Sequence, residues 1–202
     1  MELITETKRN MEKAIVIGLI ISLSLMMMIM PMVDALDKSP KAVEQWFQKL
    51  PHAKQKTTKL HFYFHDIADG GANETAPIIA QANITSLSPF LFGILRMIDD
   101  PLTVGPELSS KRIGSAQGIY GSAAMDEFGL LMNLNFVFTQ GPYKGSTLSL
   151  LGRNAIGQQY REMPIVGGSG LFRLARGIAT AKTYFANFTL AIVEYHLIVL
   201  HY

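Results

Sequence analysis

Apolar and polar positions alternate with a period of two residues through much of the chain after residue 58. In LHFYFHD, at 60–66, Leu60, Phe62 and Phe64 share one face of an extended strand, and this face is predicted to be buried. Asp66 falls at the end of the same face. Because Asp favours turns, alternation alone favours a cap on the turn that follows, with a carboxylate in a buried pocket as the alternative.

The alternation predicts eight strands separated by turn residues, among them DGGAN at 69–73, DDP at 99–101, QGPYKG at 140–145 and VGGSG at 166–170. Short strands at even spacing, with almost no helical periodicity, indicate an all-β fold that is an antiparallel barrel or sandwich. The predicted strands lie near residues 59–67, 77–85, 91–98, 112–124, 129–139, 145–152, 171–182 and 188–202.

One strand rich in glycine favours the barrel over the sandwich. Gly114, Ala116 and Gly118 occupy one face of the strand predicted at 112–124. Small residues within a strand either mark tight bends or leave room for a ligand. A barrel of about eight strands has no free sheet edge and holds one small ligand in its mouth. We therefore predict an eight-stranded antiparallel β-barrel with a ligand pocket in the barrel.

The first part of the chain differs from the rest in composition. A run without charge at 14–30 follows three basic residues, and small residues at 33–35 close it. This pattern predicts a secretory signal peptide over residues 1–35, with a membrane anchor as the alternative. Residues 36–58 are predicted to be an entry segment with a short helical turn, and residues 59–202 to be the barrel domain.

Composition and charge narrow the class of function. The chain is 49% hydrophobic, has a formal net charge of +2 and contains no cysteine. It can bury a sizeable core, but it lacks the basic footprint of a nucleic-acid-binding protein and cannot form disulfides or thiolate metal sites. Three sequons begin at Asn73, Asn83 and Asn187. Beside a signal peptide they predict a secreted glycoprotein in which at least two of them are glycosylated.

Two apparent motifs are better explained by strands and turns. His61 and His65 are four residues apart, and on a strand this separates them by about 13 Å, which is too far for one ion. No metal site is therefore predicted. The run Gly167-Gly168-Ser169-Gly170 precedes no helical pattern, so it cannot place a phosphate at a helix N-terminus. It is interpreted as a tight connection between strands.

Five blocks of the sequence together resemble the plant dirigent proteins. They are LHFYFHDI (60–67), SAQGIYGSA (115–123), YKGSTLSLLGRN (143–154), REMPIVGGSGLFRLARGIA (161–179) and VEYHLIVLHY (193–202). In order, they cover most of residues 59–202. The resemblance implies a secreted glycoprotein of the apoplast or cell wall. It also implies an eight-stranded barrel of the allene-oxide-cyclase type that assembles as a homo-oligomer, a trimer or dimer.

The resemblance further implies a function without a cofactor. In this family a separate oxidase, typically a laccase, makes phenoxy radicals from a phenolic substrate. The dirigent protein then imparts stereoselectivity on their coupling, as in lignan biosynthesis, and this is the function we expect. Some relatives are instead cofactor-free cyclases that act through a quinone methide, as in pterocarpan formation. Others are scaffold proteins of the lignified cell wall, and both alternatives stay open at this point.

The resemblance places individual residues in the pocket. It assigns Asp66, Tyr120 and Arg161 as catalytic groups. The lignan-forming branch has a second pocket aspartate where Gly152-Arg153-Asn154 stands here, so this chain resembles the broader branch with GRN. Because an amide cannot take up a proton as a carboxylate does, the two-acid ring closure of pinoresinol formation is not expected. The residues predicted to bind substrate are Phe62, Phe64, Phe136, Phe138 and Asn154.

Overall fold

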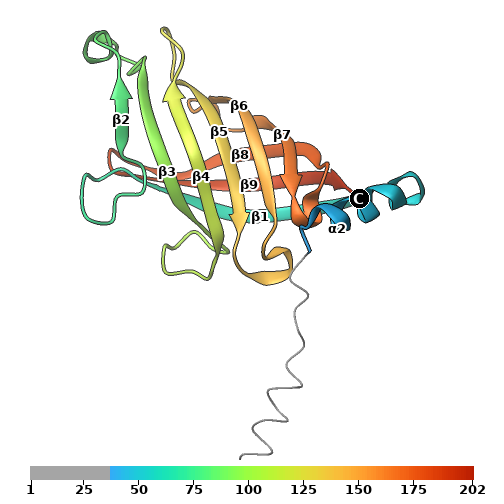
Figure 1. Ribbon diagram of the computed structural model, residues 1–202. Helices are drawn as coiled ribbons and strands as arrows, with labels where there is room; N and C mark the ends of the chain where they lie inside the picture. Colours follow the sequence, from blue (N-terminus) through green and yellow to red (C-terminus); the bar gives the residue numbers. More distant parts are fainter. Residues whose placement is uncertain (1–36) are drawn as a thin grey trace, which may run out of the picture. The chain divides into compact units, whose positions relative to one another are not determined.

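Residues 37–202 form a nearly all-β structure (Figure 1). The computed structural model describes these residues, and the predicted signal peptide lies outside them. No helix in this described part is long and apolar enough to cross a lipid bilayer. The helical elements are α2 (Pro40–Lys49), η1 (Leu50–His52), η2 (Thr85–Leu87), η3 (Gly141–Tyr143) and η4 (Gly170–Phe172). The strands are β1 (Lys56–Ile67), β2 (Ile78–Gln81), β3 (Ile94–Thr103), β4 (Arg112–Ser122), β5 (Gly129–Phe138), β6 (Thr147–Ala155), β7 (Arg161–Ser169), β8 (Arg176–Ala186) and β9 (Leu190–His201).

Strand β1 closes the barrel by pairing with two neighbours. It runs antiparallel to β9 along all 12 of its residues, and it meets β3 at Tyr63 and Phe64. The ring order is therefore β1-β9-β8-β7-β6-β5-β4-β3 and back to β1, with every pair antiparallel. Strand β2 pairs with β3 outside this ring (Figure 1). The predicted eight-stranded antiparallel barrel is confirmed.

The eight strands of the ring are not the eight that alternation predicts. The strand expected at 77–85 is reduced to the four residues of β2 and lies outside the ring. Strand β7 is the eighth strand of the ring in its place, although the glycine-rich second half of β7 looks like a turn in the sequence. Residues 161–165 of β7 pair with β8, and residues 165–169 pair with β6. Pairing with distant strands thus forms a strand where the local signal is weak.

The DDP triplet is also wrong as a turn, because it lies inside β3. Asp100 pairs with Ala116 and Pro101 with Ser115 of β4. Proline cannot donate to a ladder, and it is tolerated here because β2 pairs with β3 only at residues 94–96 and β1 only at 102–103. Between those contacts the second edge of β3 has no strand beside it. Asp100 alternates with the exposed Asp99 along β3, so it faces the barrel interior, where it is fully buried.

Aromatic side chains fill one end of the barrel. The ring of Phe62 lies 5.1 Å from Phe136 and 5.9 Å from Tyr195, measured between centroids. Phe172 of η4 lies 5.9 Å from Phe138 and extends the cluster beyond the strands. All five rings are buried. Packed in edge-on and stacked contacts, they close this end of the barrel and leave polar groups to the other end.

The small residues of β4 allow its backbone to approach β5 closely. A Cβ on Gly114 would lie 2.0 Å from the Val137 carbonyl oxygen, and one on Gly118 would lie 2.1 Å from the Asn133 carbonyl oxygen. Ala116, between the two glycines, is fully buried. Of the two roles expected for these small residues, the tight curvature of the sheet is the one that the structure supports.

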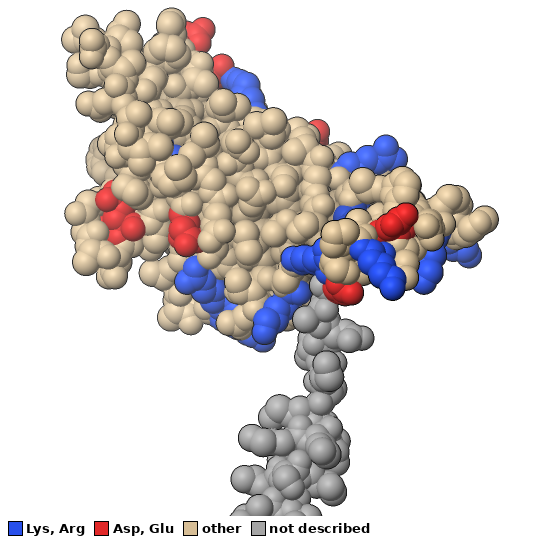
Figure 2. Space-filling view, viewed as in Figure 1, with Lys and Arg blue, Asp and Glu red and all other residues tan. Residues whose placement is uncertain are grey.

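The outer face of β3 to β6 carries few charged side chains (Figure 2). Met97, Leu131 and Leu151 project from it, and each is about half exposed. Lys and Arg gather instead towards helix α2. Helix α2, which the sequence predicts as a short helical turn, buries none of its residues. The guanidinium of Arg173 lies over the ring of Trp46 on this helix, 5.4 Å from the ring centroid. The barrel therefore presents an apolar outer surface that nothing in the described chain covers.

Gly118→Ala should destabilise the barrel, because its Cβ would overlap the Asn133 carbonyl oxygen. We expect a loss of about 2–3 kcal/mol in the free energy of unfolding, measured by urea denaturation with circular dichroism. Gly157→Ala is the matched control, since no atom lies within 4 Å of a Cβ at that position. It should change stability by less than about 0.5 kcal/mol. Equal stability of the two variants would contradict the close contact between β4 and β5.

Candidate functional site

Asp66 points into the barrel, where it accepts a hydrogen bond from a side chain across the β1–β3 closure. The hydroxyl of Tyr120, on β4, donates a hydrogen bond of 2.7 Å to Asp66 Oδ2. The turn after β1 is capped by Asp69 instead, which accepts from the Gly71 amide. The turn-cap interpretation of Asp66 is therefore wrong. Burial raises the pKa of Tyr120, so the phenol stays protonated and acts as the donor.

A second carboxylate lies beside Asp66, and it comes from β3. Phe64 of β1 lies opposite Leu102 of β3. Because the strands are antiparallel, Asp66, two residues after Phe64, and Asp100, two residues before Leu102, reach the same level on the inner face. Burial, and then the charge of Asp66, raise the pKa of Asp100 to about 9. The hydroxyl of Thr75 donates to Asp100 Oδ1. Asp100 thus carries its proton at neutral pH.

Tyr120 and Arg96 together make Asp66 different from Asp100. Arg96 faces inward on β3, directly opposite Tyr120 in the ladder, and donates to the Ala76 carbonyl oxygen. The Arg96 side chain is also within ion-pair distance, 3.9 Å, of Glu74. Burial raises the pKa of Asp66, but the Tyr120 hydrogen bond and the positive charge of Arg96 both lower it again. Asp66 is therefore the carboxylate that ionises first, and Asp100 is the one that keeps its proton. This is an acid–base pair whose protonation states are separated by their surroundings.

Each carboxylate of the pair has one oxygen that is free to act. Asp66 Oδ1 and Asp100 Oδ2 are both buried and have no hydrogen-bond partner within residues 37–202. Buried polar atoms are nearly always paired in native proteins, with the protein itself, water or a ligand. Together with Nδ1 of His65 and of His201, these two oxygens are the buried side-chain atoms without a partner in the described residues, and they are the two that belong to the acid–base pair.

Arg161 and Asn154 form a second polar group on the facing wall. Arg161 Nε donates to Asn154 Oδ1 at 3.0 Å, and Nη1 donates to Thr183 Oγ1 at 2.9 Å and to the Gln158 carbonyl oxygen at 3.4 Å. The side chain is only 3% exposed, and burial lowers its pKa. No carboxylate of the described residues forms an ion pair with it. A buried cation held by neutral partners is suited to an anion that develops during a reaction.

The ring order shows how the two groups face one another. The carboxylates and Tyr120 are on β1, β3 and β4, whereas Arg161 and its side-chain partners are on β6, β7 and β8, across the barrel. Tyr195 of β9 lies between them. Its pKa is raised by burial, lowered by the charge of Arg161 and raised by those of Asp100 and Asp66. The two polar groups therefore lie on facing walls of the barrel, with Tyr195 on the strand between them.

The structure brings together only some of the residues predicted for the pocket. Asp66 meets Tyr120, and Arg161 meets Asn154. The predicted substrate-binding rings of Phe62, Phe64, Phe136 and Phe138 lie in the hydrophobic core with Tyr195. The three sequon asparagines are all exposed: Asn73, Asn83 and Asn187.

Asp100 and Arg96 are the functional candidates that the sequence interpretation missed. The signal was present, because Arg96, Ile98, Asp100 and Leu102 alternate with outward residues in the same way as the inner face of β1. The DDP triplet concealed it, since Asp and Pro together are typical of a turn. The sequence does not predict the second carboxylate of the lignan-forming branch, because Asn154 stands in its position. The structure places a second carboxylate, Asp100, in the interior from a different strand.

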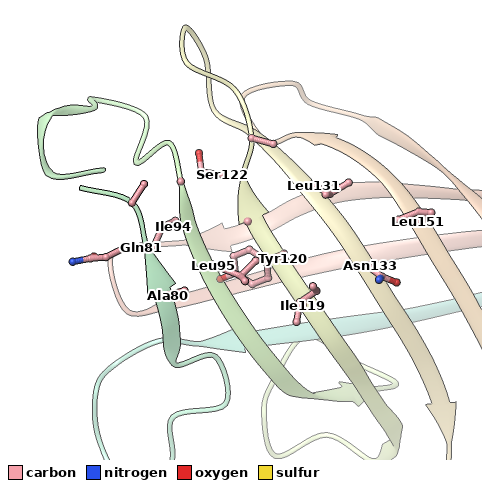
Figure 3. Close-up of a pocket in the computed structure, with 14 residues that line it drawn as sticks. Ala80, Gln81, Ile94, Leu95, Ile119, Tyr120, Ser122, Leu131, Asn133 and Leu151 are labelled. Carbon is pink, nitrogen blue, oxygen red and sulfur yellow. The ribbon is translucent and has the colours of Figure 1, made fainter. Parts of the chain in front are cut away.

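A hollow on the outside of the sheet is separate from this polar interior (Figure 3). It has a volume of about 490 Å³ and lies beside β2, bordered by the outer faces of β3 to β6. Ile119, Leu131 and Leu151 line it, with Asn133 as one of its few polar groups. Tyr120 is the member of the acid–base cluster that borders it. The hollow is therefore mainly a feature of the apolar outer face, and Tyr120 is shared between it and the interior site.

Asp100→Asn should stabilise the protein at alkaline pH. Between the unfolded pKa of 3.8 and the folded pKa of about 9, the native state must take up a proton that the unfolded chain has lost, so wild-type stability falls as pH rises through this window. The amide removes this penalty. We expect a gain of roughly 1–3 kcal/mol at pH 8 relative to pH 4.5, measured by urea unfolding.

The matched control is Asp99→Asn, which removes the same charge from the neighbouring, exposed position. It should leave the pH dependence of unfolding close to that of the wild type. An identical pH dependence for Asp100→Asn and Asp99→Asn would show that Asp100 is ionised in the native state.

Comparison with known proteins agrees with the fold and the sequence blocks. A family model described as dirigent-like protein matches residues 57–200. The chain is 44% identical over 182 residues to Dirigent protein 23 of Arabidopsis thaliana, which covers 89% of this chain and 95% of the relative. It is 49% identical over 152 residues to Pterocarpan synthase 1 of Glycyrrhiza echinata, covering 74% and 80%. The solved structure of a pterocarpan synthase dirigent protein matches with a TM-score of 0.69 at 49% identity, over 74% of this chain and 92% of that one. The chain belongs to the dirigent protein family.

Proposed function

We propose that this barrel closes a ring stereoselectively on a phenolic substrate through a quinone methide, without an oxidase. Membership of the dirigent family supports stereoselective control of a phenolic substrate. The observation that favours acid–base ring closure over radical coupling is the pair of Asp66 and Asp100, of which Asp100 holds its proton more strongly, opposite Arg161, which forms no ion pair within residues 37–202. Radical coupling needs orientation alone, whereas ring closure through a quinone methide needs a donor and an acceptor of protons.

The proposed reaction uses each group once. The reacting phenol binds at Arg161 as its phenolate, after giving its proton to solvent, and ring closure restores this phenolate, which takes a proton from solvent on release. Asp100 gives its proton to the benzylic hydroxyl, which leaves as water while the electrons of the phenolate form the quinone methide. A second phenol of the substrate attacks the methide carbon, and Asp66 takes the proton of this phenol as the carbon–oxygen bond forms. The proton then passes from Asp66 to Asp100. The net change is the loss of one water molecule and the formation of one cyclic ether.

Stereoselectivity follows from the enclosure of the substrate between the two walls. With its phenolate at Arg161 and its leaving group at Asp100, the quinone methide would present one face to the phenol beside Asp66. The aromatic end of the barrel would exclude water, which is the competing nucleophile. Tyr120 and Arg96 are positioning residues in this scheme, because they orient Asp66 and set its pKa.

The mature protein incubated with a hydroxyisoflavan-type alcohol should form one enantiomer of the ring-closed product without an oxidase, as read by chiral chromatography. Asp66→Asn should lower the rate about 10²- to 10⁴-fold, because the amide cannot accept the proton. Asp69→Asn, in the exposed turn next to it, is the control and should keep the full rate. Product formation at the wild-type rate in Asp66→Asn would contradict the scheme.

The same panel separates the other functions of the family. Stereoselective products that form only when a laccase oxidises a phenol such as coniferyl alcohol would identify a guide for radical coupling and overturn the proposal. Binding to lignified wall material, with no effect on any product, would identify a scaffold protein instead.

The pH dependence of kcat/KM tests which carboxylate is the acid. Activity should decline above a pH of about 9, as Asp100 loses its proton. On the acidic side, burial places the pKa of Asp66 above the ordinary value of 3.8, so the rate should be lost at a higher pH than an exposed aspartate would give. Asp99→Asn should keep both limbs of the profile. An alkaline limb that persists in Asp100→Asn would assign it to another group.

We also propose that the protein is a secreted homo-oligomer of the apoplast, as members of its family are expected to be. The predicted signal peptide and the exposure of Asn73, Asn83 and Asn187 support secretion with glycosylation. The apolar outer face of β3 to β6, with its hollow, supports self-association. An interface there would bury the exposed side chains of Leu131 and Leu151.

A further inference from the structure

Two histidines and a glutamate meet on the outside of the barrel, apart from the interior acid–base pair. His61 of β1 lies directly opposite His196 of β9 in the antiparallel ladder, and Glu194 precedes His196 by two residues on the same face. One ligand atom from each of these side chains lies within 4.8 Å of the other two. The sequence predicts no metal site when His61 is compared only with His65, along a single strand. That comparison misses the partners that the neighbouring strand brings alongside.

A nitrogen of each imidazole lies close to the same oxygen of Glu194. His61 Nε2 is 2.8 Å from Glu194 Oε1, and His196 Nε2 is 3.3 Å from the same oxygen. The two imidazole rings stack with their centroids 4.3 Å apart. Around a tetrahedral zinc ion, neighbouring ligand atoms are separated by about 3.3 Å. Small rotations of the two exposed histidines are therefore enough to match this geometry.

Glu194 is held in place as an anion between the two rings. Both imidazole nitrogens approach its oxygen Oε1, which fixes the orientation of the carboxylate. The hydroxyl of Tyr63 donates to the same oxygen at 3.3 Å and would orient the carboxylate as an outer-sphere group. A metal ion would take the place of the protons that the imidazoles share with this carboxylate.

We propose that His61, Glu194 and His196 bind a divalent transition metal ion of the zinc class, with water completing its coordination. Two imidazole nitrogens and one carboxylate oxygen are a ligand set that zinc uses, and Cu²⁺ would bind the same set more tightly. The ion would link the first and last strands of the barrel from outside. This inference does not depend on the proposed ring closure, because none of its residues faces the interior.

Other charged or titratable groups surround the site and affect its strength. Lys182 lies opposite Glu194 in the β8–β9 ladder, so its positive charge opposes a bound cation. The other groups that face the site or its tyrosine are Lys59 and Tyr63 of β1, Tyr184 of β8 and Glu107 of the β3–β4 connection. Lys182→Gln should therefore tighten metal binding without touching a ligand.

The test is calorimetric titration of the mature protein, purified without a histidine tag, with ZnCl₂ at pH 7.5. We expect one saturable site, and at zinc a hundredfold above its Kd a rise in Tm of about 5–10 °C. Co²⁺ should give the absorption bands of a tetrahedral nitrogen and oxygen site.

His61→Ala and Glu194→Gln should each weaken zinc binding at least about tenfold. If His61→Ala does not fold, His196→Asn serves in its place. It keeps a polar side chain and should weaken zinc binding to the same extent. His52→Ala is the matched control, since His52 is an exposed histidine of η1 outside the cluster. A loss of affinity in His52→Ala equal to that in His61→Ala, or zinc binding that never saturates, would overturn the proposal.

Discussion

The pairing of β1 with both β9 and β3 is the contact on which the rest of this molecule depends. It joins the first and last strands of the barrel and closes the ring. The contact with β3 covers only two residue pairs, so the strands separate just beyond Phe64. There the segment at 75–77 fills the gap, accepting from the Asp99 and Met97 amides and donating to the Ile67 carbonyl oxygen. Asp66 and Asp100 lie at this seam, which is why two carboxylates can be enclosed without breaking a ladder.

The two ends of the barrel interior differ in their side chains, and this difference determines the chemistry of the site. One end is filled with packed rings. At the other end, burial of Asp100 and the charge of Asp66 make ionisation of the second carboxylate unfavourable. This second end holds the acid–base pair on one wall and Arg161 with neutral partners on the other. Since charges interact strongly in such an environment, a few polar groups are enough to hold and move a proton. The same burial lowers stability wherever it suppresses ionisation, so the site carries a cost in folding.

The outer surface shows that each strand serves two environments. On β1, Phe62 and Phe64 belong to the core while His61 and Tyr63 face outward towards Glu194 of β9. On β4, Tyr120 enters the site while Ile119 borders the outer hollow. The period of two in a strand makes this division automatic, because neighbouring side chains point to opposite faces. The proposed metal ligands therefore lie apart from the interior chemistry, whereas self-association at the hollow would reach it through Tyr120.

The sequence by itself determined the fold class, the inward face of β1 and the membership of Asp66, Tyr120 and Arg161 in the family's motifs. These features are written in local alternation and in contiguous blocks of residues. Tertiary structure alone decided that β7 replaces the strand expected at 77–85, that Asp100 supplies the second carboxylate and that His61 meets Glu194 and His196. Each of these depends on which strands become neighbours and in what register. That choice is made by long-range pairing and burial, which leave no periodic signal in any single segment of the chain.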